Sequence, residues 1–362
     1  MKQTKVQLIE KQIKETLKRF APNQRFLLGC SGGLDSVVLL VALYRIFAES
    51  DHCFQLRVAH VDHDLQAPSS DWAKQVVAQC EALNIEVAVK KVKVAAGNLE
   101  NEARNARYAA FREVIAPDEV LVLAHHQQDQ AETVLMRLLS GSGVSGLAAM
   151  RELQTQDQIT IWRPLLSTAR DEIHQYAVNH QLHWVDDPAN HDLSFDRVVM
   201  REKVWPLLAA HWGGFEAAMA RTAGLMADAE SVLKEQGEID LAATQNKDGS
   251  LNILAVLALS DARVRWLLAR WMQGDARYAP PLSRVEAVRE MLIARIDSTP
   301  QVIWQTEHCK FQFRRYQDQL YRLPLELPVA GTQSLVVSMA QSLVLPTGNW
   351  CVAMMENGLS LS

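Results

Sequence analysis

The first half of the sequence alternates short apolar runs with longer segments of helical periodicity, and this alternation constrains the fold more than any other feature. The apolar runs have the length of buried strands and lie at 25–30, 54–60, 85–92, 119–124 and 159–162. The segments that predict helices are 36–47, 71–83, 100–114, 130–139, 168–180 and 195–209. Strands that alternate with helices form a mostly parallel sheet with helices on both faces. We therefore expect an α/β domain over residues 1–212.

The pattern changes after Gly213 and Gly214. Apolar residues then recur at helical spacing in three segments, 216–236, 254–272 and 283–296. Residues 302–323 alternate like a β-hairpin, and short strands and turns fill the rest of the chain. We expect a mainly helical second domain over residues 213–326 and a β-rich stretch over residues 327–362.

A glycine loop joins the first expected strand to the first expected helix of the α/β domain. It is composed of Ser31, Gly32, Gly33, Leu34, Asp35 and Ser36. Ligands of an open parallel sheet bind beyond the carboxyl ends of its strands, and a helix N-terminus there attracts phosphate. The loop lacks the Gly-Lys-Ser/Thr of a Walker A motif. An aspartate beside a polyanion makes sense if it binds Mg²⁺, so the loop predicts an ATP site in which Asp35 holds the metal.

A second polar constellation follows the strand expected at 119–124. Asp129 and Glu132 are three residues apart and share one face of the next helix. Because this strand ends at the same sheet edge as the glycine loop, Asp129 can complete a metal site with Asp35. Helix capping, with Asp129 as N-cap and Glu132 in a capping box, is the alternative interpretation, and it is compatible with catalysis.

Composition and charge indicate which partners and which cellular location the protein can have. The formal net charge is −5, yet basic residues cluster locally, around 11–25, 90–112 and 263–270. Such clusters bind phosphates or simply form solvated helix faces. The five cysteines are scattered without a Cys-x-x-Cys pair, and we find no signal peptide and no apolar run long enough to span a membrane. A cytoplasmic protein is expected.

The glycine loop resembles the Ser-Gly-Gly-x-Asp-Ser motif of the PP-loop ATP pyrophosphatases, whose fold is adenine nucleotide alpha hydrolase-like. The resemblance implies that ATP is cleaved between its α and β phosphates and that the substrate is activated as an adenylate. The loop alone does not choose among the enzymes of that family.

Further motifs resemble the tRNA(Ile)-lysidine synthetase (TilS) family in the same order. They are Ala-His-Val-Asp-His-Asp-Leu (59–65), Gly-Asn-Leu-Glu (97–100), Ala-Arg-Asn-Ala-Arg-Tyr (103–108), His-His-x-x-Asp-Gln-Ala-Glu-Thr (125–133), Arg-Pro-Leu-Leu (163–166) and Trp-Val-Asp-Asp-Pro (184–188). The resemblance implies ATP-dependent ligation of lysine to C2 of the wobble cytidine in the CAU anticodon of tRNA(Ile). The intermediate is an adenylated tRNA, and AMP and pyrophosphate are released.

The resemblance also implies roles for individual residues. The loop from Ser31 to Ser36 holds the phosphates, Asp35 and Asp129 hold Mg²⁺, and Glu132 orients or deprotonates the lysine ammonium. The remaining candidates bind the nucleotide, steady the adenylated base or contact the tRNA backbone: they are His60 and His125 for the nucleotide, Arg197 or Arg201 for the base, and Arg104 and Arg107 for the tRNA.

The sequence departs from the family pattern in places. Gln128 stands where the family commonly has a second aspartate, and Val198 where it has asparagine. Longer members carry another small C-terminal domain, and the chain is expected to end inside it or just before it. A PP-loop tRNA thiolase, a catalytically decayed tRNA-binding protein and a small-molecule ligase are the alternatives. Whether the chain forms a homodimer is left open.

Overall fold

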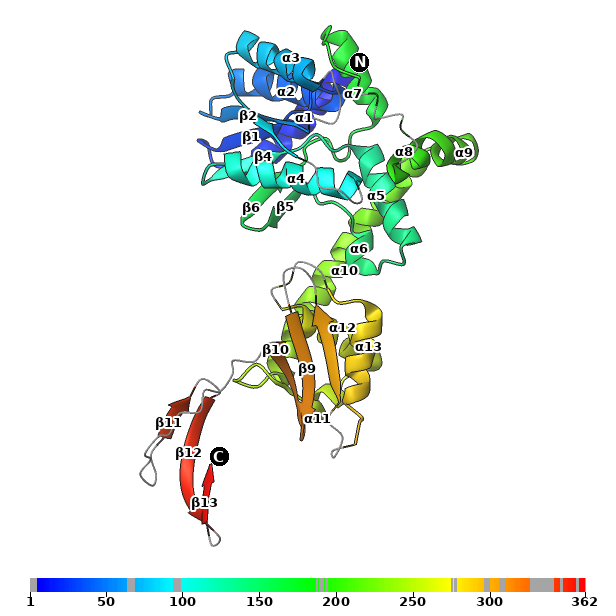
Figure 1. The fold of residues 1–362 in the computed structure, drawn as a ribbon. Helices are drawn as coiled ribbons and strands as arrows, with labels where there is room; N and C mark the ends of the chain where they lie inside the picture. The colour runs from blue at the N-terminus through cyan, green and yellow to red at the C-terminus, as the bar shows by residue number, and fades with distance from the viewer. Residues whose placement is uncertain are drawn as a thin grey trace. The chain divides into compact units, whose positions relative to one another are not determined.

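The computed structural model describes residues 5–63, 69–93, 99–186, 188, 192, 195–274, 276, 279–295, 300–305, 310–325, 342–345, 348–355 and 358–361. The chain divides into two compact units, Met1–Glu230 and Ser231–Ser362 (Figure 1). No helix within the described ranges is long and apolar enough to cross a membrane.

The first unit contains a six-stranded sheet in the order β3-β2-β1-β4-β6-β5. Its strands are β1 (Arg25–Gly29), β2 (Gln55–Asp62), β3 (Glu86–Lys91), β4 (Glu119–Val122), β5 (Leu153–Gln156) and β6 (Ile159–Trp162). Neighbouring strands are parallel except β5, which runs antiparallel to β6. The expected mostly parallel sheet is therefore confirmed. The edge strand β5 was not expected, because its sequence Leu-Gln-Thr-Gln contains no apolar run.

Helices cover both faces of this sheet (Figure 1). They include α1 (Lys5–Leu17), α2 (Leu34–Ala48), α3 (Ser69–Ala82), α4 (Leu99–Val114) and α7 (Arg170–Asn179). Side chains of β1 alternate between the two faces. Phe26 and Leu28 belong to a buried cluster with residues of α1, α2, α3 and α7. Leu27 belongs to a second cluster with Phe111 of α4. The central strand is thus apolar on both faces, as its uninterrupted apolar run predicted.

A π-helical turn interrupts the helix expected at 195–209. The segment consists of α8 (Asp196–Val199), the π-helix Met200–Val204 and α9 (Trp205–His211). The N–H of Trp205 donates to the carbonyl of Met200, five residues earlier. Pro206 has no N–H to offer an α-helical partner, which favours the wider turn at this point. Short π-helical turns are frequent at functional sites.

The second unit is helical and then β-rich, in the expected order. The helix α10 (Phe215–Thr244) crosses the boundary between the units. The described helices that follow are α11 (Ile253–Leu257), α12 (Asp261–Gln273) and α13 (Leu282–Met291). The single helix expected at 254–272 is two helices, because Ser260 begins a new one as N-cap of α12.

Strands complete the second unit. An antiparallel sheet in the order β7-β10-β9-β8 contains β7 (Leu251–Asn252), β8 (Gln301–Gln305), β9 (Lys310–Tyr316) and β10 (Gln319–Pro324). The hairpin expected at 302–323 is therefore three strands of this sheet. A three-stranded sheet of β11 (Ser342–Leu345), β12 (Gly348–Met355) and β13 (Gly358–Leu361) lies in the stretch expected to be β-rich.

Candidate active site

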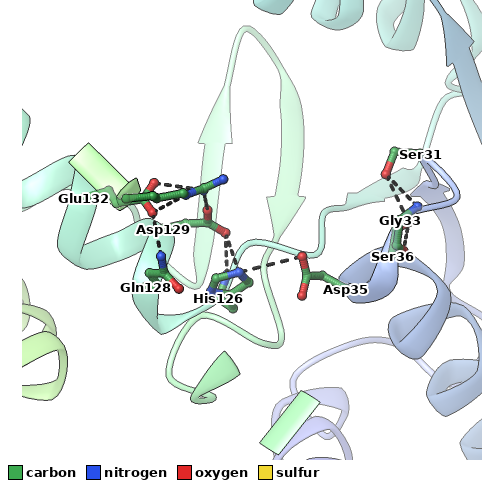
Figure 2. A network of polar contacts seen from close by, with 9 residues as sticks. Ser31, Gly33, Asp35, Ser36, His126, Gln128, Asp129 and Glu132 are labelled. Atoms are coloured by element: carbon green, nitrogen blue, oxygen red, sulfur yellow. Dashed lines mark hydrogen bonds and ion pairs between the residues drawn. The ribbon is translucent and has the colours of Figure 1, made fainter. Parts of the chain in front are cut away.

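The glycine loop is held in shape by its own serines (Figure 2). The N–H of Gly33 donates to Ser31 Oγ at 3.3 Å, and Ser36 Oγ donates to the carbonyl of Gly33 at 2.9 Å. The two hydroxyl oxygens lie 3.2 Å apart. Gly32 has a φ of +87°, in the region that favours glycine. The loop ends at the N-terminus of α2, where the helix dipole and the first N–H groups attract an anion.

Neighbouring segments support the loop from outside. The N–H of Val185 donates to the carbonyl of Gly32 at 2.9 Å. His60 at the end of β2 is buried, and its Nδ1 lies 2.9 Å from the carbonyl oxygen of Cys30. Burial lowers the pKa of His60, so its ring is neutral at pH 7 and donates through Nδ1. The contribution of Val185 was not recognised from the sequence, although it lies in the Trp-Val-Asp-Asp-Pro motif.

The helix that carries the second constellation begins earlier than expected. The helix α5 (Gln127–Leu139) has His126 as N-cap, and the N–H of His126 donates to Asp129 Oδ2 at 3.0 Å. Asp129 therefore occupies the third helical position. The capping alternative was right that Asp129 caps this helix, but wrong in register, since Asp129 is not the N-cap and Glu132 takes no part in the cap.

An arginine from the π-helical turn joins the two carboxylates of α5. Arg201 donates to Glu132 through Nε and Nη2, at 2.5 Å and 2.9 Å, and its Nη2 also donates to Asp129 Oδ1 at 3.0 Å. Glu132 is fully buried. It also accepts a hydrogen bond from the Gln128 amide at 3.1 Å. A buried ion pair needs good geometry and additional hydrogen bonds, and this network has both.

The environments of the carboxylates shift their pKa values in opposite directions. Burial alone would raise the pKa of Asp129, but the charges of His126, His125 and Arg201 and the hydrogen bond from the His126 N–H lower it to about 2. Burial raises the pKa of Glu132 against the opposing effect of Arg201. Two carboxylates one turn apart are thus a strong anion and a more basic group, an arrangement suited to separate tasks.

His126 connects the glycine loop with α5 (Figure 2). Its Nε2 lies 3.7 Å from Asp35 Oδ2 and 3.5 Å from Asp129 Oδ2. The Asp35 side chain extends from the loop towards this imidazole. Burial raises the pKa of Asp35. The two aspartates expected to share a metal therefore face a common histidine, whose part was not anticipated.

The donor set fits a magnesium ion that also binds phosphate. Asp35 Oδ1 is buried and has no hydrogen-bond partner among the residues that the structure describes. Within the described part of the chain, no group of three His, Cys, Asp or Glu side chains is arranged to hold a metal by itself. Mg²⁺ is commonly held by one or two carboxylates together with substrate phosphates and water. Asp35, with Asp129 beyond His126, offers such a partial set.

Cationic side chains gather around His125. Burial is the main cause that lowers the pKa of both Arg107 and Arg163, and the charge of Arg104 contributes in each case. The charge of Arg197 acts on Arg107 and on Glu132. Burial lowers the pKa of His125 to about 3, with Arg163, Arg107 and Arg104 contributing. Arg163 follows β6 in the Arg-Pro-Leu-Leu motif, which was noticed in the sequence without a role.

The structure thus brings Asp35, Asp129, Glu132 and Arg201 together and sets His125 and Arg197 next to them. His60 lies against Cys30, at the base of the glycine loop. Several residues of the motifs lie outside the described ranges: they are 64, 65, 97, 98 and 187.

Two family descriptions match the chain. Residues 5–208 match a PP-loop domain, and residues 251–321 match the TilS substrate binding domain. The tRNA(Ile)-lysidine synthase of Acinetobacter baylyi is 41% identical over 84% of this chain, which spans 65% of that relative. The enzyme of the same name from Shigella flexneri is 38% identical over 94% of this chain, which spans 78% of it.

A solved structure is also similar. It is the U34-tRNA thiolase NcsA from Methanococcus maripaludis, with a TM-score of 0.49 and 17% identity, over 61% of this chain and 78% of that one. This likeness carries no argument about activity. The two matching domains and the identity to the relatives above show that the chain belongs to the tRNA(Ile)-lysidine synthase family.

Proposed function

We propose that this chain uses ATP to ligate lysine to C2 of the wobble cytidine in the CAU anticodon of tRNA(Ile), in the cytoplasm. The observation that carries the proposal is the pair Asp129 and Glu132, which lies beside the phosphate loop and already holds a cationic side chain. An ATP site next to a subsite for a cation is what lysine ligation requires. We assign the reaction to the domain of residues 1–212 and tRNA binding to the domain of residues 213–326. The β-rich stretch of residues 327–362 receives no role in the reaction.

In the first step the loop from Ser31 to Ser36 receives the phosphates of ATP. The N-terminus of α2 supplies N–H donors in a loop that is already folded. The Ser31 hydroxyl can also donate to phosphate, whereas the Ser36 hydroxyl must first release the Gly33 carbonyl. The C2 oxygen of the cytidine attacks the α-phosphorus, the bond to the β-phosphate oxygen breaks, and pyrophosphate leaves. Asp35 and Asp129 would hold Mg²⁺, which when bound neutralises charge on the phosphates.

In the second step the lysine amine attacks C2 of the adenylated cytidine, the C2–O bond breaks, and AMP leaves. The amine enters as an ammonium and must lose a proton to attack. Asp129, whose pKa is about 2, remains an anion and attracts the ammonium. Glu132, whose pKa is raised by burial, is the better proton acceptor of the two.

The arginines around His125 are suited to the phosphodiester backbone of the anticodon. Arg104, Arg107 and Arg197 carry guanidinium groups that can form paired hydrogen bonds to phosphate. Arg163 is buried and donates to the carbonyl of Arg151, so it contributes only its charge. Because Arg107 is desolvated, the arrival of a phosphate relieves an electrostatic cost already present in the free protein. Arg197 connects this cluster with Glu132, which is where a wobble base would lie.

The cysteines give no support to the thiolase alternative. Burial raises the pKa of Cys30, and it raises that of Cys80 to about 12, so both thiols are poor nucleophiles at neutral pH. Cys53, the third cysteine with a described side chain, is exposed.

The test is to incubate the protein with Mg·ATP, labelled lysine and an unmodified tRNA that has a CAU anticodon. We expect label in the tRNA, and no label when C34 is replaced. Asp129→Asn should abolish the labelling while the affinity for tRNA stays within about twofold. Labelling that fails, or that does not depend on C34, would overturn the proposed function, and binding without pyrophosphate release would favour the decayed tRNA-binding protein.

A further inference from the structure

Gln128 makes a buried contact with the carboxylate that is proposed to receive the lysine proton. Gln128 and Glu132 are 7% and 0% exposed, and they lie one turn apart on α5. The Gln128 amide donates from Nε2 to Glu132 Oε1 at 3.1 Å (Figure 2). A hydrogen bond to a buried carboxylate stabilises its ionised form and fixes the orientation of its oxygens.

The other donor to the same oxygen comes from a different element. Arg201 Nε donates to Glu132 Oε1 from the π-helical turn, and Arg201 Nη2 donates to Glu132 Oε2. A lysine ammonium that approaches Asp129 and Glu132 competes with Arg201 for these oxygens. When the ammonium displaces Arg201, Glu132 loses its bidentate partner. Gln128 remains, because it is on the same helix as Glu132 and its amide carries no charge for the ammonium to repel.

The charges around Glu132 explain why a neutral side chain is suited to donate a hydrogen bond to it. Arg201 and Arg197 are cationic, and Asp129 is anionic. The aspartate that the family commonly has at this position could not donate to Glu132 when ionised, so the donor at position 128 distinguishes this chain from such relatives. A cation there would compete with the ammonium. An amide of this length supplies a hydrogen bond and changes no charge.

We propose that Gln128 is a positioning residue that holds Glu132 in its productive orientation while Arg201 is exchanged for the lysine ammonium. The inference rests on the proposed function and concerns only its second step. Gln128 donates to Glu132, which acts only in the second step, so the adenylation of the tRNA should not depend on Gln128.

Two variants distinguish the effect of losing the hydrogen-bond donor from the effect of changing the size of the side chain. Gln128→Met keeps a similar length and removes the donor, whereas Gln128→Glu is isosteric and replaces the donor with an acid. Adenylation is measured as pyrophosphate release from ATP and tRNA without lysine. Lysine transfer is measured as decay of the isolated adenylated tRNA at varied lysine concentration. For Gln128→Met we expect adenylation within about twofold of wild type and about tenfold slower transfer. Gln128→Glu should transfer more slowly still.

Gln130 on the same helix provides a matched control. It is 5% exposed, and its amide exchanges two hydrogen bonds with the backbone of Met150, at 2.9 Å and 3.0 Å. Gln130→Met should lower the melting temperature and leave the ratio of the two rates per folded molecule unchanged. A change in this ratio as large as that in Gln128→Met would overturn the proposal, because any buried glutamine of α5 would then suffice.

Two further outcomes decide against the proposal. Transfer at the wild-type rate in Gln128→Met would show that the donor is not needed. Transfer in Gln128→Glu as fast as wild type or faster would show that position 128 serves by its size or as a metal ligand. Both results are read against a wild-type protein that lysidinylates tRNA. If the wild type forms no adenylated tRNA, the proposed function fails instead.

Discussion

Arg201 and Glu132 form a two-point ion pair, with Nε 2.5 Å from Oε1 and Nη2 2.9 Å from Oε2. The carboxylate is fully buried, and the arginine side chain is 27% exposed. The pair therefore lies at the protein surface, with the carboxylate buried and the guanidinium partly exposed to solvent. A buried carboxylate that has lost its partner is costly, so either this guanidinium or another cation must be present.

Replacing Arg201 should accordingly destabilise the protein and make it respond more strongly to lysine. We expect Arg201→Met to lower the free energy of unfolding by about 3 kcal/mol, since it leaves Glu132 and Asp129 without their shared cation. Lysine should restore more stability to the variant than to wild type, because no arginine then competes for the subsite. Urea denaturation with and without lysine measures both effects.

The control for this variant is Arg112→Met. Arg112 pairs with Asp157 at 2.6 Å, but both side chains are exposed, at 41% and 45%. Exposed pairs contribute about 0–1 kcal/mol, so this variant should stay close to wild type and gain no extra stabilisation from lysine. Equal responses of both variants to lysine would contradict the competition between Arg201 and the substrate.

A substitution in the glycine loop should impair ATP binding specifically. A Cβ at Gly32 would lie 3.0 Å from Val76 Cγ2, and the φ of +87° already disfavours any other residue. Gly32→Ala should therefore distort the loop and raise the KM for ATP about tenfold or more. Gly141 has a φ of +71° with nothing within 4 Å of its Cβ position. Gly141→Ala carries a similar backbone penalty of about 1 kcal/mol without touching the phosphates, so its KM for ATP should be unchanged.

The central strands and the glycine loop could be predicted from the sequence because local chemistry determines them. An apolar run such as Phe26 to Leu28 is buried on both faces whatever surrounds it. The loop requires glycine where φ is positive. Both signals are contained in a few consecutive residues, and this explains why the parallel sheet and the place of the glycine loop between β1 and α2 were expected correctly.

The partners of the site residues could not be predicted in the same way. Arg201 reaches Asp129 and Glu132 across about 70 residues of chain, from a π-helical turn that interrupts a helix with unbroken apolar periodicity. The start of α5 was placed late because His126 is an uncommon N-cap, and Asp129 looks like a better one. Such features depend on which elements pack together, which no short segment encodes.

The imidazole of His125 makes stability depend on pH, because desolvation and the nearby arginines lower its pKa. Its pKa is lowered from 6.5 to about 3, so the ring stays neutral in the folded state while the unfolded chain takes up a proton below pH 6.5. Stability is therefore lost as the pH falls from 6.5 towards 3, by up to about 1.4 kcal/mol per pH unit. His125→Asn should remove this contribution, so its loss of stability between pH 7 and pH 5 should be smaller than that of wild type.

The control for His125 is the exposed His52, and both are followed by urea denaturation at several pH values. His52→Asn should give a curve of unfolding free energy against pH that runs parallel to wild type. A His125→Asn curve that is also parallel would show that the ring is protonated in the folded protein, contrary to its lowered pKa.

The ion pairs of the arginines on α12, in the second unit, indicate which of them can contact RNA. On α12, Arg263 is held by the buried Asp240 at 3.0 Å through Nε. Arg270 lies 3.4 Å from the exposed Glu238, a weak contact that a phosphate can replace. We expect Arg270→Ala and Arg265→Ala to weaken tRNA binding and to reduce the slope of log K against log salt by about one each. Nitrocellulose filter binding at several salt concentrations measures this slope.

Arg263→Ala serves as the matched variant on the same helix. It should lower the stability of the second unit, since Asp240 is buried and loses its cation, yet leave the salt slope unchanged. ATP binding should be unaffected in all three variants, because the phosphate loop belongs to the first unit. A fall in ATP affinity would contradict the assignment of tRNA binding to the second unit. A salt slope that changes equally in all three would mean that α12 acts through its net charge and not through individual phosphate contacts.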